Sequence, residues 1–297
     1  MTQIISHNAP FDLRNQNSFF GGWPVLRDTE QLYSVAISFP VEQSQESACV
    51  VISQSDDGTL SAESFSSERV KSQAIQQALA TLSLDVDDSK WKDVGEKDEV
   101  VSKLQNKYSF LRPILFHSPY EAAAGFIIGQ RISVKQRQAI QNKFAQLHGE
   151  KLTAEDQEFS AFPTPEKLLT INEFSGLSPA KLERLHNIAS AAIEGKLDRK
   201  YLLGLETDEA LIQLQSLPGI GPFYASGILY RGAGIVDGVT DDDLTKYAVE
   251  KAYELASEPN QKLVLEIAQN WKPYRMWCEV LLHIWLRREI GLPSRKK

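Results

Sequence analysis

The chain has 297 residues, 42% of them hydrophobic and 24% charged, with a formal net charge of −7 at pH 7. This length predicts two domains, because a domain typically holds about 100–200 residues. The two cysteines and five histidines are too few and too scattered for an iron–sulfur cluster, a disulfide framework or a zinc site, so we expect no catalytic metal and no organic cofactor.

The sequence indicates neither a leader peptide nor a membrane span. Residues 1–8 lack a basic and apolar leader pattern, and no run reaches the roughly 18 apolar residues that a membrane helix needs. We therefore expect a cytoplasmic protein without a membrane partner. The acidity lies mostly in the first third: residues 1–112 hold 16 acidic and 10 basic residues, whereas residues 113–297 hold 23 and 22. The net charge therefore does not exclude a nucleic-acid partner for the remainder of the chain.

The residue pattern of the first third predicts an α+β domain. Residues 31–53 contain two β-branched and aromatic runs around a polar stretch, which predicts two strands joined by a turn. A helix is expected over 67–82, and the acidic stretch 85–99 is suited to a domain boundary. We assign residues 1–112 to this first domain.

From residue 113 onward the sequence predicts helices. Within residues 131–150, apolar residues recur at helical spacing and predict a buried face: Ile132, Val134, Ile140, Phe144 and Leu147. In "FPTPEKL", residues 162–168, Thr164 is expected to cap a helix that has Pro165 at its first position. Further helices are predicted over 178–194, 208–216, 223–232, 244–255, 261–270 and 274–290.

The stretch "SLPGIGPFYASGILYRG", residues 216–232, predicts two helices joined by a very short loop. Pro218 cannot extend a helix, and Gly219 and Gly221 permit conformations and close approaches that a Cβ atom would forbid. The first amides of the second helix would be unpaired at the positive end of the helix dipole, which is a ready anion site. A DNA phosphate could be held there without sequence information. The alternative is a tight turn whose glycines serve packing alone.

The hairpin is one of five segments that resemble, in the same order, the helix-hairpin-helix DNA glycosylase superfamily, and specifically 3-methyladenine DNA glycosylase II, the AlkA type. The segments are residues 118–134, 162–168, 181–197, 217–232 and 271–285, and the resemblance covers residues 113–290. Residues 9–13, "APFDL", weakly resemble part of the N-terminal domain of that family, which is TATA-binding-protein-like. The resemblance implies a mainly α protein with an α+β domain over 1–112 and a bilobal all-α glycosylase domain over 113–297.

Members of this superfamily use an aspartate that follows the hairpin, and here that region reads "DGVTDDDLTKYAVEKAY", residues 237–253. Aligning the helix after it selects Asp242 as the catalytic residue, and counting from the hairpin without a gap selects Asp243 as the fallback. At least one of the three acids is expected to cap the helix. The family usually has an apolar residue, often proline, just before its aspartate, where this chain has Thr240 and Asp241.

The resemblance also implies the base pocket and the type of reaction. Bifunctional members carry a nucleophilic lysine at the start of the helix after the hairpin, and Phe223 stands there instead, which predicts a water-using enzyme without lyase activity. Cationic alkylpurines bind aromatic faces by stacking and cation–π attraction. By motif position Phe223 and Trp285 line the pocket, with Tyr224 and Trp277 as weaker candidates. Trp271 and Trp277 are expected in the core.

The segment "GQRIS" stands where the family inserts a side chain into the gap left by the flipped base. This position nominates Arg131, with Gln130 beside it, as DNA-contacting residues. Arg131 could stack in the gap, bind a phosphate or be an ordinary surface arginine.

The hairpin itself is expected to contact the DNA backbone through Leu217, Gly219 and Gly221. Family members also hold a monovalent cation on backbone carbonyls, and the matching positions here are Gln215, Leu217 and Ile220. This cation would be structural, because it helps to bind phosphate and takes no part in catalysis.

The resemblance implies a monomeric DNA glycosylase of the 3-methyladenine DNA glycosylase II type, acting on damaged double-stranded DNA in base-excision repair at the nucleoid of a bacterial-type cell. It would flip an alkylated purine out of the duplex and hydrolyse its N-glycosidic bond. Two alternatives stay open: a glycosylase for deaminated bases such as hypoxanthine or uracil, and a non-catalytic helix-hairpin-helix DNA-binding protein.

Overall fold

The computed structural model describes residues 2–7 and 10–292, and its internal contacts divide the chain into two compact units. Unit 1 holds Met1–Ser6, Asp12–Asp85 and Ile114–Gly234, and unit 2 holds His7–Phe11, Val86–Pro113 and Ile235–Lys297. Ala9, the first residue of the "APFDL" segment, lies outside the described residues. Because the units group residues by contact, the domain boundary at residue 112 stays a prediction.

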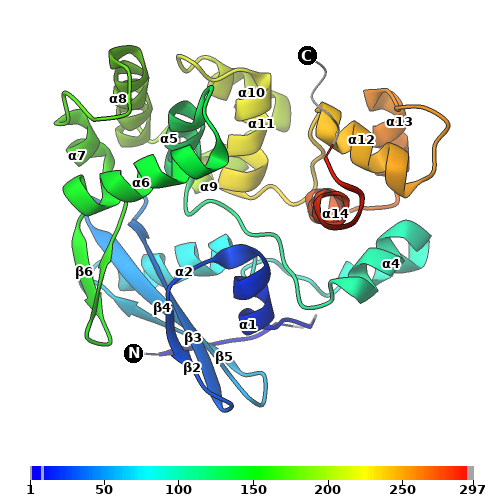
Figure 1. Ribbon diagram of the computed structural model, residues 1–297, viewed down its shortest axis with the longest axis horizontal. Coiled ribbons are helices and arrows are strands. Elements are labelled where there is room, and N and C mark those ends of the chain that lie inside the picture. The colour runs from blue at the N-terminus through cyan, green and yellow to red at the C-terminus, as the bar shows by residue number, and fades with distance from the viewer. Residues whose placement is uncertain (1, 8–9, 293–297) are drawn as a thin grey trace. The chain divides into compact units, whose positions relative to one another are not determined.

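Unit 1 contains a five-stranded antiparallel sheet with the strand order β1-β5-β4-β3-β2 (Figure 1). The strands are β1 (Gln3–Ile5), β2 (Val25–Asp28), β3 (Leu32–Pro40), β4 (Ser47–Ser55) and β5 (Leu60–Phe65). β3 and β4 pair continuously from Leu32 opposite Ser55 to Pro40 opposite Ser47, which confirms the two strands predicted over 31–53. Helix α2 (Lys71–Thr81) confirms the helix predicted over 67–82 and packs on β4 and β5.

A small hairpin that sequence analysis missed packs against this sheet. Its strands are β6 (Lys151–Ala154) and β7 (Gln157–Ser160). Leu152 and Phe159 of the hairpin share a buried cluster with Ala36, Cys49 and Val51 of the sheet. The hairpin is hard to predict because each strand has only four residues with few apolar side chains, and these become buried only against the sheet.

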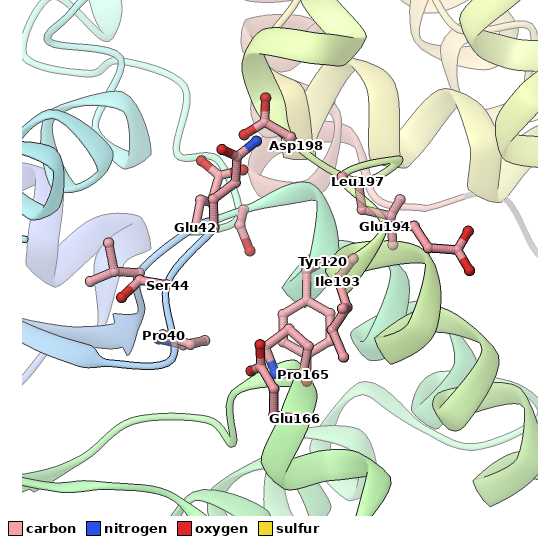
Figure 2. A pocket seen from close by; sticks show the side chains of 15 residues that line it. Pro40, Glu42, Ser44, Tyr120, Pro165, Glu166, Ile193, Glu194, Leu197 and Asp198 are labelled. Atoms are coloured by element: carbon pink, nitrogen blue, oxygen red, sulfur yellow. The ribbon is translucent and has the colours of Figure 1, made fainter.

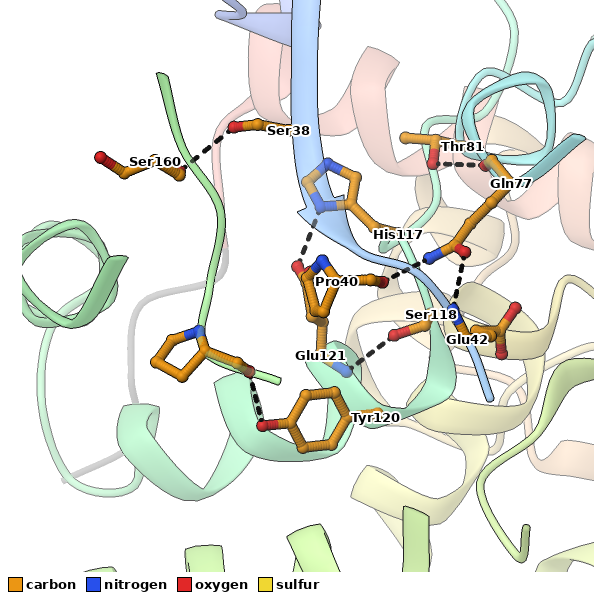
Figure 3. A network of polar contacts seen from close by, with 11 residues as sticks. Ser38, Pro40, Glu42, Gln77, Thr81, His117, Ser118, Tyr120, Glu121 and Ser160 are labelled. Atoms are coloured by element: carbon orange, nitrogen blue, oxygen red, sulfur yellow. Dashed lines mark hydrogen bonds and ion pairs between the residues drawn. The ribbon is translucent and has the colours of Figure 1, made fainter. Parts of the chain in front are cut away.

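Polar contacts join the end of β3 to its neighbours (Figure 3). The Gln77 side chain of α2 donates to the carbonyl of Pro40 at 3.1 Å and accepts from the N–H of Glu42 at 3.1 Å. The Ser38 hydroxyl donates to the carbonyl of Ser160 at 3.1 Å. The buried backbone at this strand end is thereby satisfied, which is what a strand leaving a sheet requires.

Besides α1 (Leu13–Gln16) and α2, the described part of unit 1 contains seven α-helices, several of which begin at a side-chain cap. They are α5 (Pro119–Gly129), α6 (Val134–His148), α7 (Pro165–Leu169), α8 (Pro179–Ile193), α9 (Arg199–Leu203), α10 (Thr207–Gln215) and α11 (Pro222–Gly227). Ser118, Ser133, Thr164 and Ser178 each accept a backbone N–H at the start of α5, α6, α7 and α8. The cap at Thr164 and the helix start at Pro165 are therefore confirmed.

The buried face predicted for the helix after residue 131 is largely wrong. Phe144 is fully buried, but Val134 and Leu147 are 69% and 61% exposed. Phe144 stacks on Phe174, with ring centroids 3.7 Å apart, and its ring centroid also lies 5.7 Å from that of Phe162, so an aromatic cluster anchors α6. Helical spacing alone overestimated the apolar contact of a helix whose other sides carry lysine, arginine and glutamine.

Unit 2 is helical in its described part. Its helices are α3 (Trp91–Lys97), α4 (Glu99–Lys107), α12 (Asp243–Ala252), α13 (Gln261–Ile267) and α14 (Arg275–Trp285). The acidic segment 85–99 thus contains α3, which the sequence did not predict. A buried ion pair between Arg112 and Asp88 lies in this unit, with the ring of Trp277 5.6 Å from the guanidinium carbon. In neither unit does a described helix combine the length and apolar content needed to cross a membrane.

Candidate active site and DNA interface

The two helices of the predicted hairpin, α10 and α11, are joined by a loop of six residues, 216–221. Gly219 has a φ of +88°, and a Cβ atom there would lie 2.8 Å from Cδ of Arg184 and 3.0 Å from Cδ1 of Ile127. Glycine is therefore required at 219 both by the left-handed backbone and by the close approach of α5 and α8. A Cβ atom on Gly221 would meet nothing within 4 Å. The protein's own packing thus explains the first glycine and leaves the second facing open space.

Helix α11 begins without a side-chain cap. Gly221 is its N-cap residue, in an extended conformation, and Pro222 is its first residue. The helix continues directly into a π-helical turn, η2 (Ile228–Ala233). Because no side chain occupies the first amides, the N–H groups of Phe223 and Tyr224 point out of the helix start as free donors at its positive end. This is the geometry expected of an anion site.

The carbonyls proposed for a monovalent cation are only partly used within the chain. The carbonyl of Leu217 accepts the N–H of Ile220 at 3.0 Å. Those of Gln215 and Ile220 accept no backbone hydrogen bond from any described residue. The donor set therefore fits a cation held by carbonyl oxygens, and the site stays a prediction.

Gln130 joins the hairpin loop to two neighbouring helices. Its amide nitrogen donates to the carbonyl of Gly219 at 2.8 Å, and its oxygen accepts from Arg184 at 2.7 Å. Lys181 donates to the carbonyls of Ile128 and Gln130 at 2.8 and 2.7 Å. Burial, followed by the charge of Arg184, lowers the pKa of Lys181. These contacts give Gln130 the role of a support for the loop, since both ends of its amide already have partners in the chain.

Arg131 follows with a left-handed backbone, at a φ of +59°, and its side chain is exposed. A non-glycine residue in this region is strained by about 1–2 kcal/mol, which is typical of functional positions. No hydrogen bond or ion pair to another described residue holds its side chain. The position thus presents a free cation beside the hairpin.

Phe223 and Tyr224 form an aromatic surface at the start of α11. Phe223 is 58% exposed, and its ring centroid is 5.7 Å from that of Tyr224. Tyr224 in turn stacks on Phe126 of α5, with centroids 5.0 Å apart. These three rings line a pocket of about 190 Å³ between α5, α6 and α11. Because Phe223 is 58% exposed, its ring is accessible to a stacking ligand.

The three consecutive acids in unit 2 lie in different environments. Asp242 is the N-cap of α12, where its Oδ1 accepts the N–H of Thr245 at 2.8 Å. Asp241 is exposed and forms an ion pair with Lys246 at 2.5 Å. Asp243 is exposed in the first turn of the helix. Asp242 is thus the only one of the three that is half-buried, and one of its oxygens is free of the capping bond. This geometry favours Asp242 over Asp243 as the reactive carboxylate.

A buried polar network that sequence analysis missed lies beside Asp242. Glu279 of α14, only 4% exposed, accepts from the backbone N–H of Thr240 at 3.2 Å and also from the Thr240 hydroxyl. Its Oε1 accepts the hydroxyl of Thr245 at 2.6 Å. Nε2 of His283 lies 3.0 Å from that same hydroxyl. The sequence signal was Glu279 itself, a carboxylate within the apolar run "WCEVLLHIW", where a charged residue needs buried partners.

The pKa of Glu279 is raised to about 7, first by burial and then by the charge of Asp242, while hydrogen bonds from Thr240 and Thr245 act in the opposite direction. A buried acid that titrates near neutral pH is typical of functional sites, although ion-pair networks in cores show it as well.

The tryptophans near the C-terminus divide as expected. Trp271 and Trp277 are fully buried, and the indole of Trp271 donates to Asp98 at 3.2 Å and to Tyr253 at 2.9 Å. Both are core residues, so Trp277 does not line a pocket. Trp285 is half-buried at the end of α14, which leaves part of its ring accessible. Phe223 belongs to unit 1 and Trp285 to unit 2.

A second pocket of unit 1 is acidic (Figure 2). It has a volume of about 360 Å³, and its carboxylates are Glu42, Glu166, Glu194 and Asp198. Burial raises the pKa of Glu42 to about 7, although the N–H of Arg199, 3.0 Å away, stabilises its charge. Four carboxylates repel phosphate, so this pocket does not belong to the DNA interface.

Comparisons with known proteins agree with this fold. No family model matches the chain. A DNA-3-methyladenine glycosylase 2 of Escherichia coli is 31% identical over 170 residues, which span 56% of this chain and 56% of that protein. The match thus covers little more than half of either chain.

Solved structures match over nearly the whole chain. A 3-methyladenine DNA glycosylase from Archaeoglobus fulgidus superposes with a TM-score of 0.75 at 23% identity, covering 96% of this chain and 98% of that one. A Clostridium acetobutylicum 8-oxoguanine glycosylase/lyase in complex with double-stranded DNA gives a TM-score of 0.68 at 17% identity, covering 97% of both chains.

The chain therefore has the fold of these DNA glycosylases, mainly helical with an antiparallel five-stranded sheet near its N-terminus. In sequence, the chain is similar to the Escherichia coli DNA-3-methyladenine glycosylase 2 over that matched part.

Proposed function

We propose that the protein is a monofunctional DNA glycosylase that removes alkylated purines of the 3-methyladenine type from double-stranded DNA in base-excision repair. The observation that carries the proposal is the state of Asp242. It is a half-buried carboxylate with one oxygen fixed by the helix cap and the other within a polar network, and aligning the helix that follows selects it as the counterpart of the family's catalytic aspartate.

The hairpin supplies the grip on DNA in this proposal. The free amides of Phe223 and Tyr224, at the start of α11, bind a backbone phosphate without adding positive charge to the chain. The open space at Gly221 lets the strand approach the backbone. Arg131 either fills the gap left by the flipped nucleotide or binds a second phosphate. Through these contacts an acidic protein binds a polyanion as a monomer, in the compartment that holds the DNA.

The reaction follows from the residues. Flipping a damaged base out of the duplex costs a few kcal/mol, least where pairing is already weakened. The aromatic surface of Phe223 suits a flat cationic base, because its ring face carries partial negative charge. As the glycosidic bond breaks, its electron pair leaves with the base and positive charge builds on C1′ of the sugar. The carboxylate of Asp242 stabilises that charge and takes a proton from the water that attacks C1′.

The absence of a lysine at position 223 supports hydrolysis by water. A lyase would need an amine there to form a Schiff base, and Phe223 has none. We therefore expect an abasic site with an intact strand as the product.

The test is to incubate the protein with duplex DNA carrying methylated purines, uracil or hypoxanthine, and to separate the free bases by chromatography. Release of 3-methyladenine without strand cleavage is the expected result. Release of uracil or hypoxanthine alone would assign the protein to deaminated bases. Binding to all three DNAs without any free base would identify a non-catalytic DNA-binding protein and overturn the proposal.

A further inference from the structure

Glu279 holds the loop of Asp242 from both sides. Its Oε1 accepts from Thr240, two residues before Asp242, and from Thr245, three residues after it. One buried oxygen on α14 therefore fixes both the entry to the loop and the first turn of α12. A surface carboxylate would not order a loop in this way, because water would compete for the same donors.

The hydroxyl of Thr245 is the link between the two carboxylates. Its oxygen lies 2.6 Å from Oε1 of Glu279, 3.0 Å from Nε2 of His283 and 3.3 Å from Oδ2 of Asp242. A hydroxyl has one hydrogen, so it can donate to only one of these three atoms at a time. The direction of this one hydrogen therefore determines which two of the three atoms receive no hydrogen bond from Thr245.

We propose that Glu279 is a positioning residue for Asp242, and that it acts by deciding where the hydroxyl hydrogen of Thr245 points; this inference rests on the proposed glycosylase function. An ionised Glu279 can only accept, so it takes that hydrogen at the shortest of the three distances. Oδ2 of Asp242 then keeps its lone pairs for the attacking water and the sugar.

The opposite state arises when Glu279 carries a proton. Its own O–H can then donate to the oxygen of Thr245, and the hydrogen of Thr245 turns to Oδ2 of Asp242. That hydrogen bond occupies the oxygen that the reaction needs. Because the pKa of Glu279 is raised to about 7, both states are populated near neutral pH.

His283 of α14, whose Nε2 lies 3.0 Å from the Thr245 hydroxyl, is the other titratable group at this exchange. Among the described residues Glu279 makes hydrogen bonds only with Thr240 and Thr245. Asp98, which caps α4, accepts from Tyr253 and Trp271 instead. On α12, which packs on α14, Lys246 pairs with Asp241 and Lys251 pairs with Glu250. Other titratable or charged groups on elements around α14 include Asp88 and Arg112, which pair with each other, Lys107 and Tyr108, which bind Glu289, Arg275, which binds Asp237, and the buried thiol of Cys278.

The experiment is the pH dependence of 3-methyladenine release under single-turnover conditions, between about pH 6 and pH 8. This base leaves from a cationic nucleotide, so its departure needs no added proton and the profile reports on the protein. The wild-type rate is expected to rise about tenfold over this range, following the ionised fraction of a group that titrates near 7.

The variants separate a positioning role from a merely structural one. Glu279→Gln keeps an acceptor oxygen that does not titrate, so the rate is expected to stay near the wild-type rate at the alkaline end throughout the range. Thr245→Val removes the link and also flattens the profile, while Thr245→Ser restores the rise. Glu266→Gln removes an exposed carboxylate of α13 and serves as the control with an unchanged profile. A wild-type rise of about tenfold that persists in both Glu279→Gln and Thr245→Val overturns the inference.

A second measurement does not depend on activity. In the wild type the side-chain carboxyl ¹³C resonance of Asp242 is expected to move in a step near pH 7, as Glu279 ionises, and Thr245→Val is expected to abolish that step. If the wild type released no base from any DNA, the proposed function would fail while this measurement still decided the coupling. A wild-type resonance without the step overturns the inference even if the protein is an active glycosylase.

Discussion

The two glycines of the hairpin predict opposite consequences for the same substitution. At Gly219 an alanine would have to adopt a left-handed φ of +88° and would place its Cβ atom 2.8 Å from Arg184 and 3.0 Å from Ile127. The backbone term costs about 1–2 kcal/mol, and overpacking of a filled site costs about 1–3 kcal/mol. We expect Gly219→Ala to destabilise unit 1 by roughly 2–4 kcal/mol, since the two terms overlap when the neighbours shift.

Gly221→Ala is the matched variant. Its φ of −92° is ordinary, and a Cβ atom there meets nothing within 4 Å. Lower entropy of the unfolded chain favours alanine by about 0.4–1 kcal/mol, and a poorer N-cap offsets a similar amount, so stability should change by less than about 0.5 kcal/mol. If the strand approaches Gly221, the added methyl group displaces the phosphate from amides whose charged hydrogen bonds contribute about 1.5–3 kcal/mol each. The DNA affinity should then fall about tenfold or more.

The assay for stability is hydrogen exchange of peptides from α10 and α11, because only Trp23 among the five tryptophans belongs to unit 1 and intrinsic fluorescence therefore reports mostly on unit 2. DNA binding is measured by fluorescence anisotropy on a duplex with an abasic site. The reasoning predicts faster exchange for Gly219→Ala and unchanged exchange with weaker binding for Gly221→Ala. Wild-type affinity in Gly221→Ala would refute the phosphate site, and wild-type exchange in Gly219→Ala would refute the packing argument.

Three further predictions concern charged residues. The pKa of Glu279 is raised from 4.5 in the unfolded chain to about 7 in the folded protein, so the wild-type free energy of unfolding falls as pH rises through this window. Glu279→Gln should avoid up to about 3 kcal/mol of that loss. If urea unfolding showed the same loss between about pH 5 and pH 8 in the wild type and in the variant, the prediction would be contradicted. Arg131→Ala should leave the melting temperature unchanged and weaken binding to abasic-site DNA several-fold more than the control Lys135→Ala; equal effects would show an ordinary surface arginine. Arg112→Met leaves Asp88 buried without its ion pair and should destabilise the protein by about 3–5 kcal/mol. Urea unfolding followed by tryptophan fluorescence measures this loss, and an unchanged unfolding midpoint would contradict it.

Local signals in the sequence were enough for several elements. The β3–β4 pair, the cap at Thr164 and the glycine at position 219 each follow from residue types whose backbone preferences act over a few positions. The order of five segments then pointed to the superfamily, because a shared order of elements is a property of the whole fold.

What the sequence could not reveal depends on contacts between distant positions. The sequence does not reveal that the amide of Gln130 reaches the carbonyl of Gly219, 89 positions away. Val134 and Leu147 fit a helical stripe, yet nothing packs over them, because only Phe144 finds an aromatic partner. The link from Asp242 through Thr245 to Glu279 spans 37 positions and requires the packing of α12 on α14. Sequence patterns identify the residues of such a network but do not show that these residues are in contact.

The role of Asp242 is tested most directly by replacing it and Asp243 separately with asparagine and measuring single-turnover release of 3-methyladenine from methylated duplex DNA. In Asp242→Asn the amide side chain keeps a cap oxygen for α12 but carries no charge for C1′, so this variant should lower the rate by at least about a hundredfold with little change in DNA affinity. Asp243→Asn should release the base at close to the wild-type rate. The reverse pattern, with activity retained in Asp242→Asn and lost in Asp243→Asn, would contradict the account.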